Sequence, residues 1–294
     1  MTRRITLTTL LALIAGLALA VPSQAAPKRV VALEWDAVEN LLSLGVRPVG
    51  GADLGGYRTY VAVGLPGGIT DVGKRHEPSI ERIAKLKPDL IVVPNNRAGR
   101  NLPTLRKIAR VLVTNPYPGD TGNGAQFNAM VRDFRAIANA VAQRARGESV
   151  LRGMTSRFSS LRRSIRKRRG TRVTIATPGG TTGSPALRLF TSNSIAAEVV
   201  RRLGMRSAWT ARPQRFGFST VGVEALRQVQ SGWLAFVYPR IFAGQVGRIT
   251  SQGAYKRLDM VKMRRVKTLS GNTWLFGGPA SARIFAERLT NAMR

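Results

Sequence analysis

Short runs of consecutive apolar residues alternate with segments whose apolar residues recur every three or four positions, and this alternation limits the fold more narrowly than any other feature. A fully apolar run between turns is typical of a strand buried on both faces, and the three-to-four spacing indicates a helix. In the N-terminal half we expect strands at 29–33, 90–93 and 111–113, helices at 37–44, 78–87 and 102–109, and a short strand or turn at 48–51. This order predicts a parallel sheet covered on both faces.

Residues 125–169 have a different character, because they contain no proline and carry apolar residues at helical spacing over their first part. These apolar residues are Phe127, Met130, Val131, Phe134, Ile137, Ala138 and Val141. The pattern predicts one long helix, with Gly147 or Gly153 as the place of a break.

A second alternating series follows, with strands expected at 172–176 and 233–238, a loop at 179–180, and helices at 194–203, 223–229 and 280–293. We therefore predict an α/β protein of two three-layer lobes, 26–124 and 170–294, joined by a single long connecting helix at 125–169.

The N-terminus predicts export. Arg3 and Arg4 precede an apolar or hydroxyl-bearing run at 5–21, and small residues stand at Ser23 and Ala25. This is the pattern of a signal peptide at 1–25, and the run is short for a permanent membrane span. Cleavage near Ala25 would leave a periplasmic, secreted or cell-envelope protein, and an uncleaved anchor is the alternative.

The composition restricts the chemistry. The chain has no cysteine, so disulfides, thiolate ligands and an acylated cysteine are excluded, and its one histidine, His76, is typical of a surface group. The 47 Lys and Arg residues against 15 Asp and Glu residues give a net charge of +32, which favours anionic over cationic solutes. The basic run at 162–169 is typical of a solvated helix end, and nucleic-acid or membrane binding is the other interpretation.

The composition and motifs bear on two classes of function, an enzyme and a polyanion-binding protein. An enzyme would need a catalytic constellation, but one histidine leaves little for triad chemistry, and the glycines at 179–183 lack the lysine spacing of a phosphate-binding loop. We predict no catalytic residue, no protein-bound metal and no cofactor. The second alternative is a basic envelope protein that binds polyanions through its charge.

Candidate ligand contacts follow the expected strands, because open α/β sheets bind ligands at the carboxyl ends of their strands. Trp35 follows the first strand, and Tyr57 and Tyr60 lie in a glycine-rich stretch that we expect to be a loop. The remaining candidates found this way are Asn95, Arg97, Tyr238 and Trp274. Trp209 and Trp233 are assigned to packing.

The two halves also share a weak internal repeat. Residues 77–93 and 219–237 each contain a turn, a short helix with a glutamate in its first turn, another turn and a buried strand. The glutamates are Glu81 and Glu224. The shared order of elements favours two related lobes.

Five segments resemble the iron-complex and cobalamin family of periplasmic binding proteins, the group with a rigid helical connector. They are 29–35 (RVVALEW), 41–50 (LLSLGVRPVG), 71–81 (DVGKRHEPSIE), 87–93 (KPDLIVV) and 274–282 (WLFGGPASA). The resemblance covers about residues 29 to 290. The ferric hydroxamate and ferric citrate branch looks most similar, because of Glu34-Trp35 and Gly73-Lys74-Arg75.

This resemblance implies that a ligand is captured without chemistry in a cleft between the lobes and delivered to the membrane permease of an ABC importer. We expect a monomer and no nucleic-acid partner. The resemblance also implies that Arg75 contacts the ligand, that Glu81 and Glu224 dock to the permease, and that Phe216 and Phe218 stand where relatives often carry a tryptophan. At Asn95–Arg97 the sequence departs from the family, which often has an aromatic contact there. The implied ligand is an anionic ferric chelate of the siderophore type. Haem, with Tyr57, Tyr60 or Tyr238 as axial group, and cobalamin are the alternatives.

Overall fold

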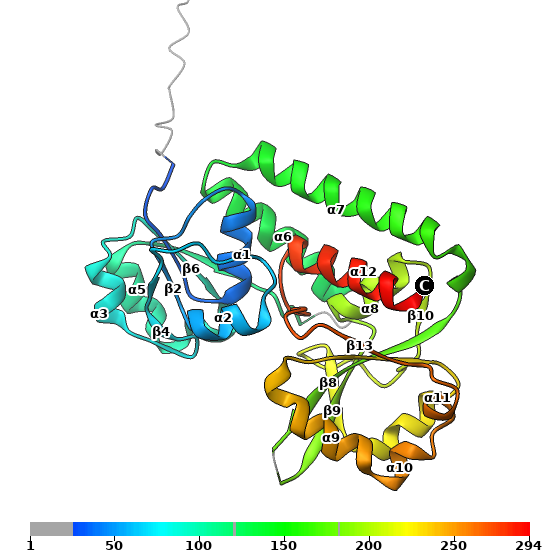
Figure 1. Cartoon of the computed structure of the whole chain (residues 1–294). Coiled ribbons are helices and arrows are strands. Elements are labelled where there is room, and N and C mark those ends of the chain that lie inside the picture. The colour runs from blue at the N-terminus through cyan, green and yellow to red at the C-terminus, as the bar shows by residue number, and fades with distance from the viewer. Residues whose placement is uncertain (1–25, 120–121, 182) are drawn as a thin grey trace, which may run out of the picture.

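The computed structural model describes residues 26–119, 122–181 and 183–294, and it has two lobes that are bridged by a layer of helices (Figure 1). The signal peptide predicted at 1–25 lies outside the described residues. The two-lobed α/β architecture confirms the predicted fold class.

The N-terminal lobe is built on a parallel sheet with the strand order β3-β2-β1-β6-β7. Its strands are β1 (Val30–Ala32), β2 (Gly50–Gly51), β3 (Thr70–Asp71), β6 (Leu90–Pro94) and β7 (Arg110–Thr114), and a separate hairpin pairs β4 (Gly73–Lys74) with β5 (Glu77–Pro78). The helices are α1 (Trp35–Ser43), α2 (Leu54–Tyr60), α3 (Ile80–Lys85), α4 (Asn95–Ala98) and α5 (Leu102–Ile108), with a 3₁₀ turn η1 (Gly99–Asn101).

The apolar strands β1 and β6 are buried on both faces, as their sequence predicts, whereas the edge strand β7 is only partly buried and Val113 is exposed. Successive side chains of a strand point to opposite faces, so Val30 and Val92 belong to the core on one side of the sheet. Val31 and Ile91 belong to a second core on the other side. The N-terminal lobe therefore has three layers.

The C-terminal lobe has a mixed sheet with the strand order β11-β9-β8-β12-β13, in which β10 also pairs with β8. Its strands are β8 (Arg172–Gly180), β9 (Pro185–Phe190), β10 (Arg206–Ser207), β11 (Phe218–Val221), β12 (Trp233–Val237) and β13 (Val266–Leu269). The helices are α8 (Ile195–Arg202), α9 (Ala243–Ser251), α10 (Gly253–Lys256), α11 (Asp259–Lys262) and α12 (Pro279–Met293), with 3₁₀ turns η3 (Val223–Val229) and η4 (Arg240–Phe242).

Two local expectations in this lobe are wrong. The loop predicted at Gly179–Gly180 is the end of β8, where both glycines pair antiparallel with the start of β9. The segment predicted as a helix at 223–229 is the 3₁₀ turn η3.

The connector is two helices, α6 (Ala125–Ala140) and α7 (Arg144–Ser164), followed by the 3₁₀ turn η2 (Arg166–Arg168), so the prediction of a single long helix is corrected. The break lies at Ala142, whose φ is +55°. The amides of Ala142 and Gln143 donate to the carbonyls of Asn139 and Ala138, which is the Schellman pattern that ends helices. Glycine usually takes the left-handed position of this motif, and here alanine takes it.

Gly147, proposed as a breaking point, instead lies within α7, where α7 packs against α6. A Cβ at Gly147 would lie 2.8 Å from the Cβ of Ala138. The glycine therefore permits close helix packing.

One continuous core joins the lobes through the connector. It contains Val30 of β1, Phe134 of α6, Phe158 of α7, Val173 of β8 and Phe285 of α12. Among the described residues, no helix is both long enough and apolar enough to cross a bilayer.

Candidate functional site

Two adjoining hollows lie between the lobes, and we call them together the cleft. The charged hollow, of about 310 Å³, is lined by Glu34, Asp36, Arg75, Pro94, Asn96, Arg97, Pro116, Tyr117, Arg188, Phe216, Phe218, Trp274 and Phe276. The aromatic hollow, of about 80 Å³, is lined by Tyr60, Thr177, Pro178, Arg188, Val237, Pro239, Phe242, Gly271, Thr273, Trp274, Leu275 and Phe276. Arg188, Trp274 and Phe276 line both, so the two hollows share a wall.

One carboxylate holds two guanidinium groups in the charged hollow. Glu34 Oε1 accepts a hydrogen bond from Arg75 Nη1 at 2.6 Å, and Glu34 Oε2 accepts from Arg97 Nε. Arg75 follows the short strand β4 and Arg97 lies in α4, so Glu34 brings together two segments that are distant in the sequence. Each guanidinium has five N–H donors, and both retain donors for a ligand.

The Arg75 guanidinium lies over an aromatic cluster. Its central carbon is 3.4 Å from the centroid of the Trp35 ring. Trp35 in turn contacts Tyr60 and Trp274, with ring centroids 5.3 and 4.9 Å apart. The indole N–H of Trp35 donates to the carbonyl of Asp53 at 2.8 Å, which fixes the ring. Arg75 is therefore held by the carboxylates of Glu34 and Asp53, the latter 3.4 Å from its Nε, and by the Trp35 indole in a favourable cation–π arrangement.

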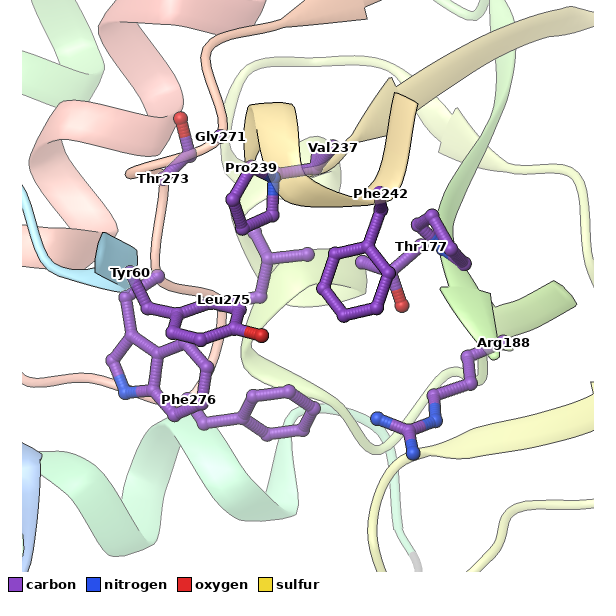
Figure 2. Close-up of a pocket in the computed structure, with 12 residues that line it drawn as sticks. Tyr60, Thr177, Arg188, Val237, Pro239, Phe242, Gly271, Thr273, Leu275 and Phe276 are labelled. Carbon is purple, nitrogen blue, oxygen red and sulfur yellow. The ribbon is translucent and has the colours of Figure 1, made fainter. Parts of the chain in front are cut away.

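The aromatic hollow is formed mainly by the C-terminal lobe, with Tyr60 as the contribution of the N-terminal lobe (Figure 2). The Tyr60 and Phe242 ring centroids are 6.5 Å apart. Arg188, exposed on β9, lies at one side of this hollow, and its guanidinium carbon is 5.0 Å from the Phe218 centroid. The cleft thus presents a third guanidinium beside apolar rings.

Two groups of the charged hollow titrate far from their ordinary range. Burial raises the pKa of Asp36 well above its usual value, and the neighbouring Glu34 carboxylate adds repulsion in the same direction. Burial also raises the pKa of Tyr117, with the charges of Glu34 and Asp36 contributing. Tyr117 is therefore a neutral phenol at physiological pH and can donate a hydrogen bond.

Replacing Asp36 by asparagine should stabilise the protein at alkaline pH. Because the pKa of Asp36 is higher in the folded chain, the stability of the wild type is fully present below the unfolded pKa and declines as pH rises through the folded pKa. The substituted amide cannot ionise and keeps an oxygen for the Ala37 amide, which donates to Asp36 Oδ1 at 2.8 Å. Thermal unfolding should be measured between pH 4 and 8. The wild type and Asp36→Asn should melt at nearly the same temperature at the acid end, and the melting temperature of Asp36→Asn should exceed that of the wild type by more as pH rises. A difference of 1 kcal/mol corresponds to about 2–4 °C. A difference in melting temperature that became smaller as pH rises would contradict the raised pKa of Asp36.

Most of the predicted contacts gather at the cleft. Tyr60, Arg75, Arg97, Phe216, Phe218 and Trp274 line one or both hollows. Trp35 is only 2% exposed and lines neither hollow, but its ring packs against Arg75, Tyr60 and Trp274, which do.

Besides Trp35, three predicted contacts lie outside the linings. Tyr57 is fully buried in the core of the N-terminal lobe because its stretch, expected as a loop, forms α2. Asn95 is exposed and its amide donates to Asn115 Oδ1 at 3.0 Å, while its neighbour Asn96 lines the charged hollow. Tyr238 packs against Phe236, beside the second core of the C-terminal lobe.

Several lining residues had not been found from the sequence. Tyr117 follows β7, and the rule of strand carboxyl ends that singled out Asn95 could have found it. Phe276 stands two positions after Trp274, a spacing that could place both rings on one side of an extended segment. Arg188 lies in β9, a strand that the sequence analysis did not predict.

Comparisons with known proteins show the family and relatives of this chain. The family model described as periplasmic binding protein matches residues 30–272. The iron(3+)-hydroxamate-binding protein FhuD of Escherichia coli is 28% identical over 274 residues, covering 91% of this chain and 87% of the relative. The Fe(3+)-citrate-binding protein YfmC of Bacillus subtilis is 26% identical, covering 89% of this chain and 79% of the relative. The crystal structure of the siderophore-binding protein FhuD from Vibrio cholerae with bound Fe3+–Desferal superposes with a TM-score of 0.81 at 28% identity, covering 90% of this chain and 97% of that one.

Proposed function

The chain belongs to the periplasmic binding protein family, and we propose on this basis that it is the extracytoplasmic solute-binding component of an ABC importer, with an iron–siderophore-type chelate as its ligand. It captures the chelate in the cleft and delivers it to the permease unchanged, without acting as an enzyme. The observation that carries the proposal is the pair of guanidinium groups, Arg75 and Arg97, held by Glu34 beside a wall of aromatic rings.

The cleft matches the two parts of such a ligand. A ferric chelate presents oxygen atoms around the metal, and guanidinium groups donate planar pairs of hydrogen bonds to such oxygens. The carbon chains that link the chelating groups of a siderophore add apolar surface, and the rings of Trp274, Phe218 and Phe276 can pack against it. Iron arrives within its chelator, so the protein recognises the complex and need not coordinate the metal.

Glu34 keeps Arg75 and Arg97 in position when no ligand is bound. Its two oxygens pair with Arg75 and Arg97, and its side chain is 12% exposed, which strengthens the attraction relative to a surface pair. This arrangement fixes the guanidinium groups before the ligand arrives and reduces the ordering cost of binding. An anionic ligand can then bind the N–H donors that Glu34 leaves free on each guanidinium.

Titration with a panel of metal chelates tests the proposal. Trp35 and Trp274 lie in or beneath the cleft, so a ferric chelate that binds should change tryptophan emission with saturable, one-to-one behaviour. The panel contains ferric hydroxamate, citrate and catecholate complexes, their iron-free chelators, haem and cobalamin. Tight binding of DNA or heparin with no response to any chelate would favour a polyanion-binding protein and overturn the proposal.

We further propose that the protein is a monomer in the periplasm or cell envelope, because both walls of the cleft come from one chain. The lobe limits are proposed at 26–124 and 170–294, with the connector at 125–169. All strands of the first sheet lie in the first range and all strands of the second sheet lie in the last.

Permease docking is proposed for Glu81 and Glu224. Both are exposed and lie in the first turn of α3 and η3, respectively. Glu81 pairs with Lys85 at 2.6 Å, but both side chains are more than 70% exposed, so a basic pocket of a partner could replace Lys85 at little cost.

The double variant Glu81→Ala/Glu224→Ala should lower chelate-dependent iron uptake about tenfold or more in cells that lack the natural copy, because each lobe loses a charge contact with the permease. Its affinity for the chelate in solution should not change. The matched control is Glu77→Ala/Asp259→Ala, which removes two other exposed acids. Equal uptake by the docking and control variants would refute the docking role.

A further inference from the structure

A third hollow, of about 540 Å³, lies at the far end of the connector, and we call it the connector-end hollow. It is lined by Arg163, Ser164, Ile165, Arg166, Lys167, Arg168, Met293 and Arg294. No residue lines both this hollow and the cleft. Figure 1 shows the end of α12 beside the turn that follows α7, and this is the place where the hollow forms.

The side-chain charge around this hollow is of one sign. Five of its eight lining residues are cations. Between Glu148 and Glu198 the chain has ten basic residues and no acidic one. Within the described part of the chain, none of the five lining cations forms an ion pair. Cations gathered without counter-ions create a strong positive potential that attracts anions.

The hollow is also ordered by specific contacts. Arg168 Nε donates to the carbonyl of Met293 at 2.7 Å, and its guanidinium carbon is 4.9 Å from the Trp233 ring centroid. Ile165 and Met293 are buried and anchor both sides of the hollow in the core. In contrast, Arg163, Arg166 and Lys167 are exposed. A fixed frame therefore carries a rim of free cationic side chains.

We propose that the connector-end hollow binds the phosphate groups of an anionic phospholipid surface and so holds the protein at the membrane that contains its permease. Arginine suits this task because its planar donors match phosphate oxygens. The chain has no cysteine that could carry an acyl anchor, so attraction to headgroups gives it another route to a membrane. This binding goes beyond the proposed capture of a chelate, and it uses none of the residues of the cleft.

A lipid surface fits the hollow better than a nucleic acid does. Single-stranded nucleic acids bind proteins through cations together with exposed aromatic rings that stack on bases. The aromatic ring here, Trp233, has Arg168 on it at 4.9 Å and Lys267 Nζ at 5.7 Å from its centroid. The two cations thus cover the ring on which a base would stack, and the hollow can still contact phosphate groups.

The test is co-sedimentation of the full chain with vesicles of 30% phosphatidylglycerol in phosphatidylcholine, and with vesicles of phosphatidylcholine alone. The variant Arg163→Gln/Arg166→Gln/Lys167→Gln removes three exposed cations of the rim. The control variant Arg100→Gln/Arg106→Gln/Lys107→Gln removes three exposed cations from the N-terminal lobe and changes the net charge equally. Each basic residue near an anionic bilayer contributes about a fivefold gain in binding, so the rim variant should bind the anionic vesicles about 100-fold more weakly.

The control variant should bind the anionic vesicles nearly as well as the wild type, and no protein should bind phosphatidylcholine alone. Both variants should keep the melting temperature and the chelate response of the wild type, which separates this proposal from the function of the cleft. Equal weakening by the two variants would show that net charge alone drives binding and would overturn the proposal. Binding to soluble polyphosphate without binding to anionic vesicles would overturn it as well.

Discussion

Alanine in place of Arg75 is expected to lower the affinity for the ferric chelate by about 10- to 100-fold. The Arg75 guanidinium faces the charged hollow, lies 3.4 Å from the Trp35 centroid and donates to Glu34 at 2.6 Å. A hydrogen bond to a charged group contributes about 1.5–3 kcal/mol, and about 1.4 kcal/mol is a tenfold change in affinity. The truncation also leaves Glu34 with Arg97 as its one remaining guanidinium partner, so the hollow becomes more negative toward an anionic ligand.

Tryptophan emission during titration with the chelate gives the dissociation constants for Arg75→Ala, Arg75→Lys and the wild type. Lysine keeps the positive charge but lacks the planar donors and the stacking on Trp35, so we expect an intermediate affinity. Arg106→Ala, at an exposed arginine of α5, is the control and should bind like the wild type. If Arg75→Ala bound every chelate as tightly as the control, Arg75 would not be a ligand contact.

Much of the fold was accessible from the sequence because its signals are local. The apolar runs of β1 and β6 have side chains in two cores, so no polar position interrupts them. The spacing of Phe127, Phe134 and Ile137 likewise matches the buried face of α6. These patterns depend on the burial of one element and need no knowledge of its partners.

The break in the connector was not accessible in this way. The left-handed residue that ends α6 is Ala142, and alanine carries no signal for that conformation. Gly147 did carry a signal, but its glycine serves the contact with Ala138. The same residue type therefore has two meanings, and tertiary packing decides between them.

The cleft was predicted in part, for a related reason. Strand ends and family motifs found Arg75, Arg97 and Trp274, since their place in the sequence is enough to identify them. Glu34 belongs to a family motif, but its role depends on two arginines that lie 41 and 63 positions away. Arg188 depends on the antiparallel strand β9, which pairs with Gly179 and Gly180 of β8, and these glycines indicate a loop in the sequence. Contacts between segments that are distant in the sequence decide which polar residues face a ligand.

Glu39 should make the largest single contribution to stability among the acidic residues of the lobe interface. It lies in α1 of the N-terminal lobe and is fully buried against the start of α12, where Ser281 donates its amide at 2.7 Å and its hydroxyl at 2.6 Å. A carboxylate is favoured at a helix N-terminus. The packing of α1 against the start of α12 is also tight, because a Cβ at Gly278 would lie 1.9 Å from Asn40 Oδ1.

Glu39→Ala is expected to lower the free energy of unfolding by about 3 kcal/mol or more, because two buried donors of Ser281 lose their acceptor. Glu39→Gln keeps one acceptor oxygen and should cost about 1 kcal/mol. Denaturant unfolding, with Glu148→Ala as the control, measures both losses. Glu148 accepts two hydrogen bonds from Arg135 at the surface, where solvent screens the pair, so Glu148→Ala should cost clearly less than Glu39→Ala.

The pH dependence of the stability cost of Glu39→Gln separates the effect of the Glu39 charge from the effect of its hydrogen bonds. Burial raises the pKa of Glu39, although the donors of Ser281 act in the opposite direction. The stability that Glu39 contributes is therefore fully present below its unfolded pKa and declines as pH rises through its folded pKa. Since glutamine does not titrate, the cost of Glu39→Gln should be largest at acid pH and should shrink toward pH 8. A cost that grew with pH would mean that the hydrogen bonds from Ser281 outweigh the burial of the charge.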